Sequence, residues 1–151
     1  MSYSIDEQST NSLWLLKNPD ETIKLGEEII LKNPSMELLL LEGPLGAGKT
    51  TLVKGIAMGM NIKEPITSPT FPLSQHYYGK EKILIHIDLY RLENSASANE
   101  LFLQEEEEAG KLNSIIIVEW PERLNMSLEN AWKITISYEE NNQRSARLVK
   151  F

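Results

Sequence analysis

A glycine-rich segment ending in Lys49 and Thr50 constrains the fold of this chain more than any other feature. It spells Gly-Pro-Leu-Gly-Ala-Gly-Lys-Thr and matches G-x-x-x-x-G-K-[ST] at every fixed position. A triphosphate needs several converging backbone N–H donors, and Gly43, Gly46 and Gly48 remove side chains that would block them and permit positive φ angles. Lys49 is expected to reach the β- and γ-phosphates, and Thr50 to offer its hydroxyl to Mg²⁺. The segment therefore predicts a loop that binds a nucleoside triphosphate.

The residues on either side of this loop have the patterns that such a loop requires. Residues 37–41 form a short apolar run suited to a buried strand. Residues 50–60 carry apolar side chains at helical spacing, and the N-terminus of such a helix favours an anion. An ordinary glycine turn that happens to contain Gly-Lys-Thr is the alternative. Strand, glycine-rich loop and helix in that order favour the phosphate-binding interpretation.

Length and composition restrict the classes of protein to which the chain can belong. With 151 residues, it is expected to form one domain spanning residues 1–151. The absence of cysteine excludes disulfides and Cys-ligated metals, and suggests a reducing, cytoplasmic location. No apolar run approaches the ~20 residues of a membrane span, and residues 1–10 are polar and acidic, unlike a secretory signal. The net charge of −7 argues against direct sequence-independent binding to DNA or RNA, and leaves open work on nucleic acid through a basic partner.

The remaining sequence predicts an α/β fold, in which a mixed sheet has a parallel core, antiparallel extensions and helices on both faces. Asn18 is expected to cap a helix with Pro19 in its first turn. Four glutamates at 105–108 are interpreted as a solvated helix face, with a docking surface for a basic partner as the alternative. The predicted elements are an edge strand at 13–16, a helix to residue 32, a strand at 37–41, a helix at 50–60, a proline-rich loop at 65–72, a hairpin at 73–78 and 83–88, a helix at 97–109 stopped by Gly110, a central strand at 115–119 and a hairpin at 132–138 and 145–151.

Two of the predicted strands end in a carboxylate, one at Asp88 and the other at Glu119. In an open α/β sheet, ligands bind outside the carboxyl ends of parallel strands, so both side chains are candidates for a metal site beside the loop. One would hold Mg²⁺, directly or through water, and the other would orient or deprotonate an attacking water. Spacing alone does not rank the two. Capping of a following turn is the alternative for each.

Other residues near these strand ends have two interpretations each. In nucleotide switches, the loop between the helix that follows the glycine-rich segment and the next strand often carries a hydroxyl that senses the γ-phosphate, which makes Thr67, Ser68 and Thr70 candidates. A plain Ser-Pro turn explains them equally well. His86 is expected to be a hydrogen-bonded structural residue, on the same strand face as Asp88. Trp120 is expected to pack on the sheet edge, with contact to the nucleotide as the alternative.

Four segments together resemble the TsaE family (formerly YjeE), small bacterial P-loop ATPases required for threonylcarbamoyladenosine modification of tRNA. The segments are Leu-Gly-Ala-Gly-Lys-Thr-Thr at 45–51, Ser-Pro-Thr-Phe at 68–71, His-Ile-Asp-Leu-Tyr-Arg-Leu at 86–92 and Val-Glu-Trp-Pro-Glu at 118–122. Apart from the loop, each is weak or moderate evidence by itself. All four in this order within one short chain are highly specific, and the likeness extends from the first helix to the C-terminal hairpin.

The resemblance implies a role for particular residues. Thr50 and Glu119 correspond to the Mg²⁺ ligands, and Asp88 corresponds to the catalytic or switch carboxylate. Thr70 corresponds to a switch-like threonine, and Trp120 to a tryptophan near the nucleotide. The implied nucleotide-binding residues are Gly43, Gly46, Ala47, Gly48, Lys49, Thr50, Thr51, Thr70 and Trp120, and the implied catalytic residues are Lys49 and Asp88.

Other parts of the chain match the family less closely, and two positions differ from it. Residues 20–22 and Arg144 match regions near the base end of the nucleotide. Pro44 stands where the family usually has an acidic residue, so no special contact of that residue is carried over. Residues 101–104, followed by the four glutamates, differ from the usual Gly-Leu-Glu pattern. Partner contacts in that region are therefore not carried over either.

The resemblance implies Mg²⁺-dependent ATP hydrolysis that serves the TsaD and TsaB proteins, which transfer threonylcarbamoyl to the adenosine beside the tRNA anticodon. The chain would then meet tRNA only indirectly. A small-molecule P-loop kinase is the rival enzyme class, but the sequence contains no basic lid segment. A GTPase switch fits less well, because residues 88–91 lack the glycine of D-x-x-G and no N-K-x-D motif is present.

Overall fold

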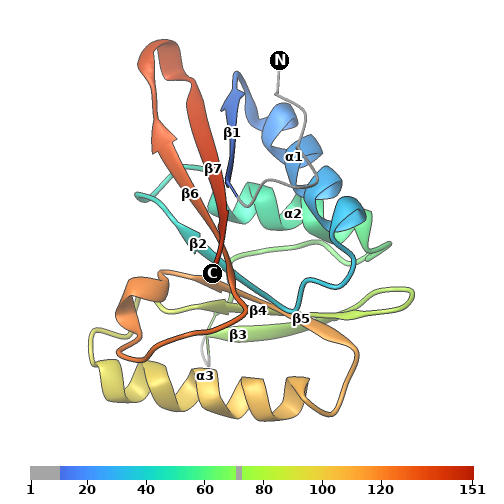
Figure 1. Cartoon of the computed structure of the whole chain (residues 1–151), viewed down its shortest axis with the longest axis vertical. Coiled ribbons are helices and arrows are strands. Elements are labelled where there is room, and N and C mark those ends of the chain that lie inside the picture. Colours follow the sequence, from blue (N-terminus) through green and yellow to red (C-terminus); the bar gives the residue numbers. More distant parts are fainter. Residues whose placement is uncertain (1–10, 71–72) are drawn as a thin grey trace.

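The computed structural model describes residues 11–70 and 73–151, and within them seven strands form one sheet in the order β1-β7-β6-β2-β5-β4-β3 (Figure 1). Residues 1–10, Phe71 and Pro72, to which parts of the sequence predictions refer, lie outside the described residues. The elements are β1 Asn11–Leu16, α1 Pro19–Lys32, β2 Leu38–Glu42, α2 Lys49–Gly59, β3 Ser74–Tyr78, β4 Ile83–Asp88, α3 Ser95–Ala109, β5 Ser114–Glu119, β6 Trp132–Tyr138 and β7 Arg144–Lys150, with short 3₁₀ turns at Pro121–Arg123 and Glu140–Asn142.

The predicted mixed sheet with a parallel core is confirmed. Strands β6, β2, β5 and β4 are parallel neighbours, while β7, β1 and β3 extend this core by antiparallel pairing. Strand β5 is buried at every position, as expected for a parallel strand covered on both faces. The first strand of the C-terminal hairpin, β6, joins the parallel core beside β2. The hairpin therefore brings residues near 138 to the loop that follows β2.

Helices cover both faces of the sheet, with α1 and α2 on one side and α3 on the other (Figure 1). Side chains alternate along a strand, so neighbouring residues belong to different cores. In β4, Leu84 packs in the core beneath α1 and α2, while Ile85 and Ile87 pack in the core with Phe102 of α3. The same alternation directs the last residue of β4 and the last residue of β5 to the α2 side. The fold thus places both strand-end carboxylates on the face that carries the glycine-rich loop.

Local sequence signals set the helix ends. The side chain of Asn18 accepts a hydrogen bond from the Glu21 amide at 3.0 Å, which confirms the predicted cap of α1. Helix α3 begins at Ser95, two residues earlier than predicted, because Asn94 caps it by accepting from the Ala96 amide at 2.7 Å. Across residues 11–70 and 73–151, the helices are too short or too polar to cross a membrane.

Candidate nucleotide-binding and metal site

The glycine-rich loop between β2 and α2 has the backbone conformation that its sequence predicts. Gly43, Gly46 and Gly48 have φ angles of 154°, 77° and 108°, in the region that favours glycine. A Cβ on Gly43 would also lie 2.7 Å from the carbonyl oxygen of Ile136 in β6. Pro44 fits a turn in which its carbonyl accepts from the Ala47 amide at 3.1 Å. The loop therefore leads directly into the N-terminus of α2, where backbone N–H groups are available to an anion.

The C-terminal hairpin of β6 and β7 contacts the glycine-rich loop through a hydrogen bond. The hydroxyl of Tyr138 in β6 donates to the Leu45 carbonyl at 2.6 Å. The guanidinium of Arg144 in β7 lies 4.2 Å from the centre of the Tyr138 ring. Tyr138 is not predictable as a site residue from local sequence, because its contact with the loop spans 93 residues and depends on β6 pairing with β2.

Lys49 is 5% exposed although it carries a charge. Its ammonium donates to the carbonyl of Gly43 and lies 3.9 Å from the centre of the Trp120 ring. Burial lowers the pKa of Lys49 below its ordinary value, and the nearby carboxylates of Glu119, Glu122 and Asp88 oppose that shift. The ammonium thus lies between the loop, an aromatic face and two strand ends.

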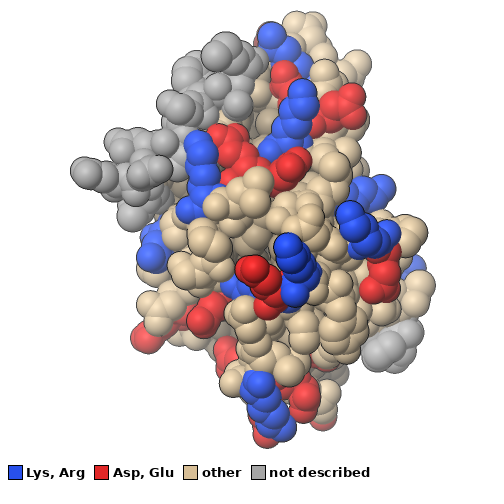
Figure 2. Space-filling model, turned by 90° about the vertical axis from the view of Figure 1, so that its right-hand side faces the viewer, with Lys and Arg blue, Asp and Glu red and all other residues tan. Residues whose placement is uncertain are grey.

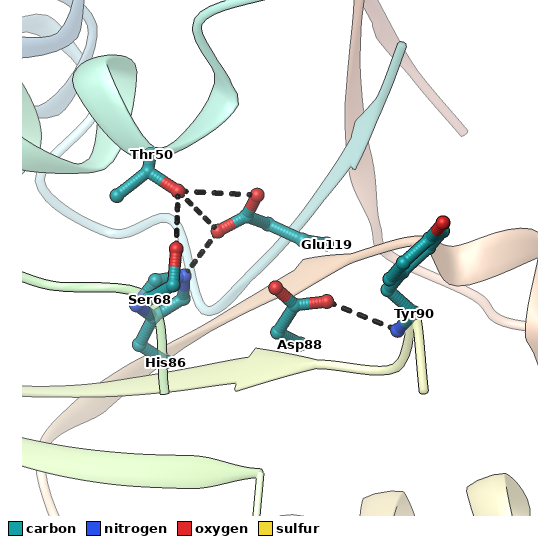
Figure 3. Close-up of polar contacts among 6 residues, drawn as sticks. All are labelled: Thr50, Ser68, His86, Asp88, Tyr90 and Glu119. Atoms are coloured by element: carbon teal, nitrogen blue, oxygen red, sulfur yellow. Dashed lines mark hydrogen bonds and ion pairs between the residues drawn. The ribbon is translucent and has the colours of Figure 1, made fainter. Parts of the chain in front are cut away.

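A cluster of polar side chains, of which Glu119 and His86 are buried, connects the loop to β5 (Figure 3). The Thr50 hydroxyl donates to the Glu119 carboxylate, at 3.1 Å from Oε2 and 3.5 Å from Oε1. The Ser68 hydroxyl lies 3.3 Å from that of Thr50, and Nε2 of His86 lies 2.6 Å from Oε2 of Glu119. Glu119 is 3% exposed. The predicted hydrogen-bonded state of His86 is confirmed, and its partner is the Glu119 carboxylate.

Asp88 lies beside this cluster but is held differently. Strands β4 and β5 pair Asp88 directly with Glu119. Oδ1 of Asp88 accepts the backbone N–H of Tyr90 at 3.0 Å (Figure 3). Burial raises the pKa of Asp88 above its ordinary value and Glu119 adds to the rise, while the Tyr90 hydrogen bond, His86 and Lys49 act against it.

A cavity of about 270 Å³ lies between the glycine-rich loop and the carboxyl ends of β4 and β5. Eight of the site residues implied by the family resemblance line it, together with Leu45, Ser68 and Tyr90. These eight are Gly46, Gly48, Lys49, Thr50, Thr51, Asp88, Glu119 and Trp120. Thr70 is exposed and is not among the lining residues; Ser68 from the same loop is the hydroxyl beside Thr50. Two larger hollows, of about 360 and 310 Å³, are lined by residues outside the glycine-rich loop.

Two aromatic residues form one wall of the cavity. Trp120 has a φ of 61°, which is uncommon for a residue with a side chain, and follows directly after Glu119. The centre of its ring lies 4.8 Å from that of Tyr90. Trp120 therefore packs at the sheet edge, as expected, and also lines the cavity, while its contact with a nucleotide stays a prediction. The wall provides a flat apolar surface beside the Lys49 ammonium.

A second, smaller hollow of about 130 Å³ lies on the other side of the loop. Asn18, Pro19 and Thr22 from the start of α1 line it together with Arg144 from the hairpin. It shares Gly46, Gly48 and Thr51 with the larger cavity. The two regions that the resemblance linked with the base end of a nucleotide thus meet at the same loop.

The oxygen atoms of Thr50 and Glu119 are suitable ligands for a hard divalent cation. The Thr50 hydroxyl and the Glu119 carboxylate present oxygens about 3 Å apart, and oxygen ligands are those that Mg²⁺ prefers. Mg²⁺ in nucleotide sites is usually held by one or two protein ligands together with phosphates and water. Thr50 and Glu119 are therefore the side chains that would hold the ion, and Asp88 lines the same cavity.

The β-strand, glycine-rich loop and α-helix, with carboxylates at the ends of the neighbouring strands, define a protein of the P-loop NTPase fold. A family model described as "Threonylcarbamoyl adenosine biosynthesis protein TsaE" matches residues 16–147. The chain belongs to the TsaE family, which is involved in tRNA threonylcarbamoyladenosine biosynthesis.

Individual relatives agree with this assignment. The tRNA threonylcarbamoyladenosine biosynthesis protein TsaE of Nostoc sp. is 34% identical over 152 residues, covering 98% of this chain and 93% of that protein. The TsaE of Aquifex aeolicus is 40% identical over 111 residues, covering 72% of this chain and 76% of that protein. The crystal structure of Bacillus subtilis YdiB matches with a TM-score of 0.65 at 27% identity, covering 91% of this chain and 84% of that one. The similarity therefore extends over both sequence and fold.

Proposed function

We propose that this chain is a Mg²⁺-dependent ATPase, folded as one domain over residues 1–151, that supports the TsaB and TsaD proteins in installing threonylcarbamoyl on the adenosine beside the tRNA anticodon. The observation that carries the proposal is the contact of the Thr50 hydroxyl with the buried Glu119 carboxylate at 3.1 Å, at the N-terminus of the helix that follows the loop. A buried carboxylate is costly unless it is paired, so its place beside this hydroxyl favours a role in binding a cation.

The loop and Lys49 would bind the phosphates. The loop leads into the N-terminus of α2, where unpaired backbone N–H groups and the helix dipole favour negative charge. The Lys49 ammonium would exchange its contact with the Gly43 carbonyl for phosphate oxygens, and it would stabilise the charge that spreads over the γ-phosphate. When bound, Mg²⁺ would neutralise phosphate charge, and Thr50 and Glu119 are the residues that would hold it.

Asp88 would orient the water that attacks the γ-phosphate. Its Oδ1 is fixed by the Tyr90 amide, which leaves the second oxygen of the carboxylate to accept from a water. The raised pKa of Asp88, caused first by burial, makes this carboxylate a better proton acceptor than an exposed aspartate. Ser68 would bring the loop after α2 close to the phosphates through its contact with Thr50.

The charge of the chain supports an indirect relation to tRNA. The net charge is −7, and on the face drawn in Figure 2 the Lys and Arg side chains are interspersed with Asp and Glu. Binding to a phosphate backbone relies on clustered basic residues. The chain would therefore act through its protein partners in the cytoplasm, without contacting DNA or a membrane.

One assay tests reaction type, base preference and partner dependence together. Hydrolysis of ATP and GTP is measured with the chain alone and with purified TsaB and TsaD, in the presence and absence of Mg²⁺. We expect slow hydrolysis of ATP by the chain alone, stimulation by the pair and loss of turnover with EDTA. Equal turnover of GTP would contradict the choice of nucleotide. Efficient phosphate transfer to a metabolite in the absence of the partners would favour a kinase instead.

A further inference from the structure

A histidine occupies an otherwise apolar position in the centre of the sheet. His86 is fully buried in β4, on the α2 face that Leu84 and Ile117 share. Its Nε2 lies 2.6 Å from Oε2 of Glu119, and the two side chains are 0% and 4% exposed. Burial of a polar ring in such a core requires a hydrogen-bond partner, and the geometry identifies Glu119 as that partner.

The hydrogen bond has a defined direction. An ionised carboxylate only accepts hydrogen bonds, so Nε2 of His86 carries the proton. The other ring nitrogen, Nδ1, is buried and has no hydrogen-bond partner among the described residues. A proton on Nδ1 would be left unpaired, which favours the tautomer with its proton on Nε2. Within residues 11–70 and 73–151, the one hydrogen bond that this ring makes is therefore directed at Glu119.

The same carboxylate has a competing partner nearby. Glu119 interacts electrostatically with the ammonium of Lys49, while its Oε2 receives hydrogen bonds from Thr50 and His86. A glutamate side chain has three rotatable bonds, so without a fixed donor it is free to turn toward the cation. The rigid imidazole on β4 holds the carboxylate beside Thr50 and leaves Lys49 available for phosphates.

We propose that His86 is a positioning residue that fixes the Glu119 carboxylate in the orientation required to hold Mg²⁺ beside Thr50. The inference rests on the proposed function, because it assigns a role to His86 within the same metal site. Partners that orient a metal-binding group typically change metal affinity by about 10–100-fold when they are removed. His86 is not among the residues that line the cavity, so it would act on the ion through Glu119.

The chain contains a matched control for this hydrogen bond. Its second histidine, His76 in the edge strand β3, pairs through Nε2 with Glu105 of α3 at 2.5 Å. This pair is partly exposed, at 31% and 14%, and does not line the cavity above β4 and β5. Loss of the His76 hydrogen bond therefore removes the same chemistry at a position remote from the site.

The test compares four variants of the full chain: His86→Leu, His86→Asn, His86→Gln and His76→Leu. The amide nitrogen of glutamine can occupy the place of Nε2, whereas that of asparagine is one methylene too short. The first measurement is the Mg²⁺ concentration for half-maximal binding of a fluorescent ATP analogue, with Mn²⁺ affinity by electron paramagnetic resonance as a second. Nucleotide affinity in EDTA and the melting temperature are recorded for every variant.

We expect the Mg²⁺ requirement to rise about 10–100-fold in His86→Leu and His86→Asn, and to return close to the wild-type value in His86→Gln. Nucleotide affinity in EDTA should change little, and His76→Leu should match the wild type. An unchanged Mg²⁺ requirement in His86→Leu would overturn the inference, as would a failure of His86→Gln to restore it. Wild-type protein without any Mg²⁺-dependent nucleotide binding would instead contradict the proposed function.

A measurement on the unsubstituted protein decides the question if the His86 variants do not fold. Long-range ¹⁵N–¹H correlation spectra report which ring nitrogen carries the proton, and His76→Leu assigns the two histidines. We expect the proton of His86 on Nε2, and a shift of that nitrogen, but not of His76, when Mg²⁺ is added to the ATP complex. A proton on Nδ1, or a His86 signal that does not respond to Mg²⁺, would contradict the inference.

Discussion

Asp88 and Glu119 end neighbouring parallel strands and are direct partners in the sheet, yet their surroundings differ. Glu119 is almost fully buried and receives hydrogen bonds from the side chains of Thr50 and His86. Asp88 is half-buried and is held by the backbone N–H of Tyr90. The carboxylate with fixed side-chain donors is suited to hold an ion, and the one with an oxygen left to accept is suited to orient water.

A third parallel strand also ends in a carboxylate, but this side chain lies outside the site. Glu42 ends β2, between β6 and β5, but alternation along the strand directs it to the α3 face. It pairs with Lys133 at 3.7 Å, as a surface ion pair of small energetic weight. Three parallel strands thus end in an acid, and side-chain direction decides which two belong to the site.

The largest loss of ATP hydrolysis is expected on removal of the Lys49 ammonium, which interacts electrostatically with both Asp88 and Glu119. Lys49→Ala removes the ammonium that Asp88 and Glu119 both influence, and we expect kcat for ATP hydrolysis to fall at least about 10³-fold. The measurement is steady-state phosphate release, with Lys54→Ala on the exposed side of α2 as the control. Unchanged hydrolysis in Lys49→Ala would remove the basis of the proposed function.

Asp88→Asn tests the water-orienting half of the comparison. The asparagine keeps an oxygen to accept from the Tyr90 amide but cannot take a proton from water, so we expect kcat to fall about 10²–10⁴-fold. The dissociation constant for Mg²⁺-ATP, measured by titration calorimetry, should change little. If affinity fell in parallel with turnover, Asp88 and Glu119 would have to exchange roles.

Glu119→Gln tests the metal-holding half. Loss of the negative charge should raise the Mg²⁺ concentration for half-maximal activity about 10–100-fold, with a smaller effect on nucleotide affinity in EDTA. Glu42→Gln is the matched control, because it removes a strand-end carboxylate on the opposite face. A normal Mg²⁺ requirement in Glu119→Gln would show that the metal ligand lies elsewhere.

The smallest expected effect is a pH-dependent change in the melting temperature on replacement of Asp88. Because burial raises the folded-state pKa of Asp88 above its unfolded value, the favourable contribution of the protonated group is present at low pH and is lost as pH rises through the folded pKa. At neutral pH the charged Asp88 therefore destabilises the fold. Asp88→Asn should melt a few degrees above the wild type at pH 7, and this gap should shrink toward pH 4. A gap that is constant with pH would mean that the charge of Asp88 costs no stability.

Local patterns in the sequence predicted most of the fold. The glycine spacing predicted the loop between β2 and α2, and Asn18-Pro19 predicted the start of α1. Alternation and turn residues predicted both hairpins, and the β-branched run predicted the central strand β5. These features depend on a few neighbouring residues, so their physical causes are visible in the sequence itself. The exception is the start of α3, which the cap of Asn94 places two residues earlier than predicted.

The candidate site was predictable only in part. Lys49, Thr50, Asp88 and Glu119 were identified as residues, but spacing did not rank the two acids, and their roles came from the family resemblance. The bond from His86 to Glu119 joins positions 33 residues apart, and that from Tyr138 to Leu45 joins positions 93 residues apart. Such contacts are set by strand order and register, which no local pattern encodes.

Local sequence is enough to predict that a phosphate-binding loop joins a buried strand to a helix, because backbone conformation at glycine and helical periodicity are local properties. The side chains that surround that loop depend on how distant strands pair. Pairing of β4 with β5 placed Asp88 opposite Glu119, and pairing of β6 with β2 brought Tyr138 over the loop. The physical reason is that hydrogen bonding between strands fixes register, and register fixes the face of the sheet to which every side chain points.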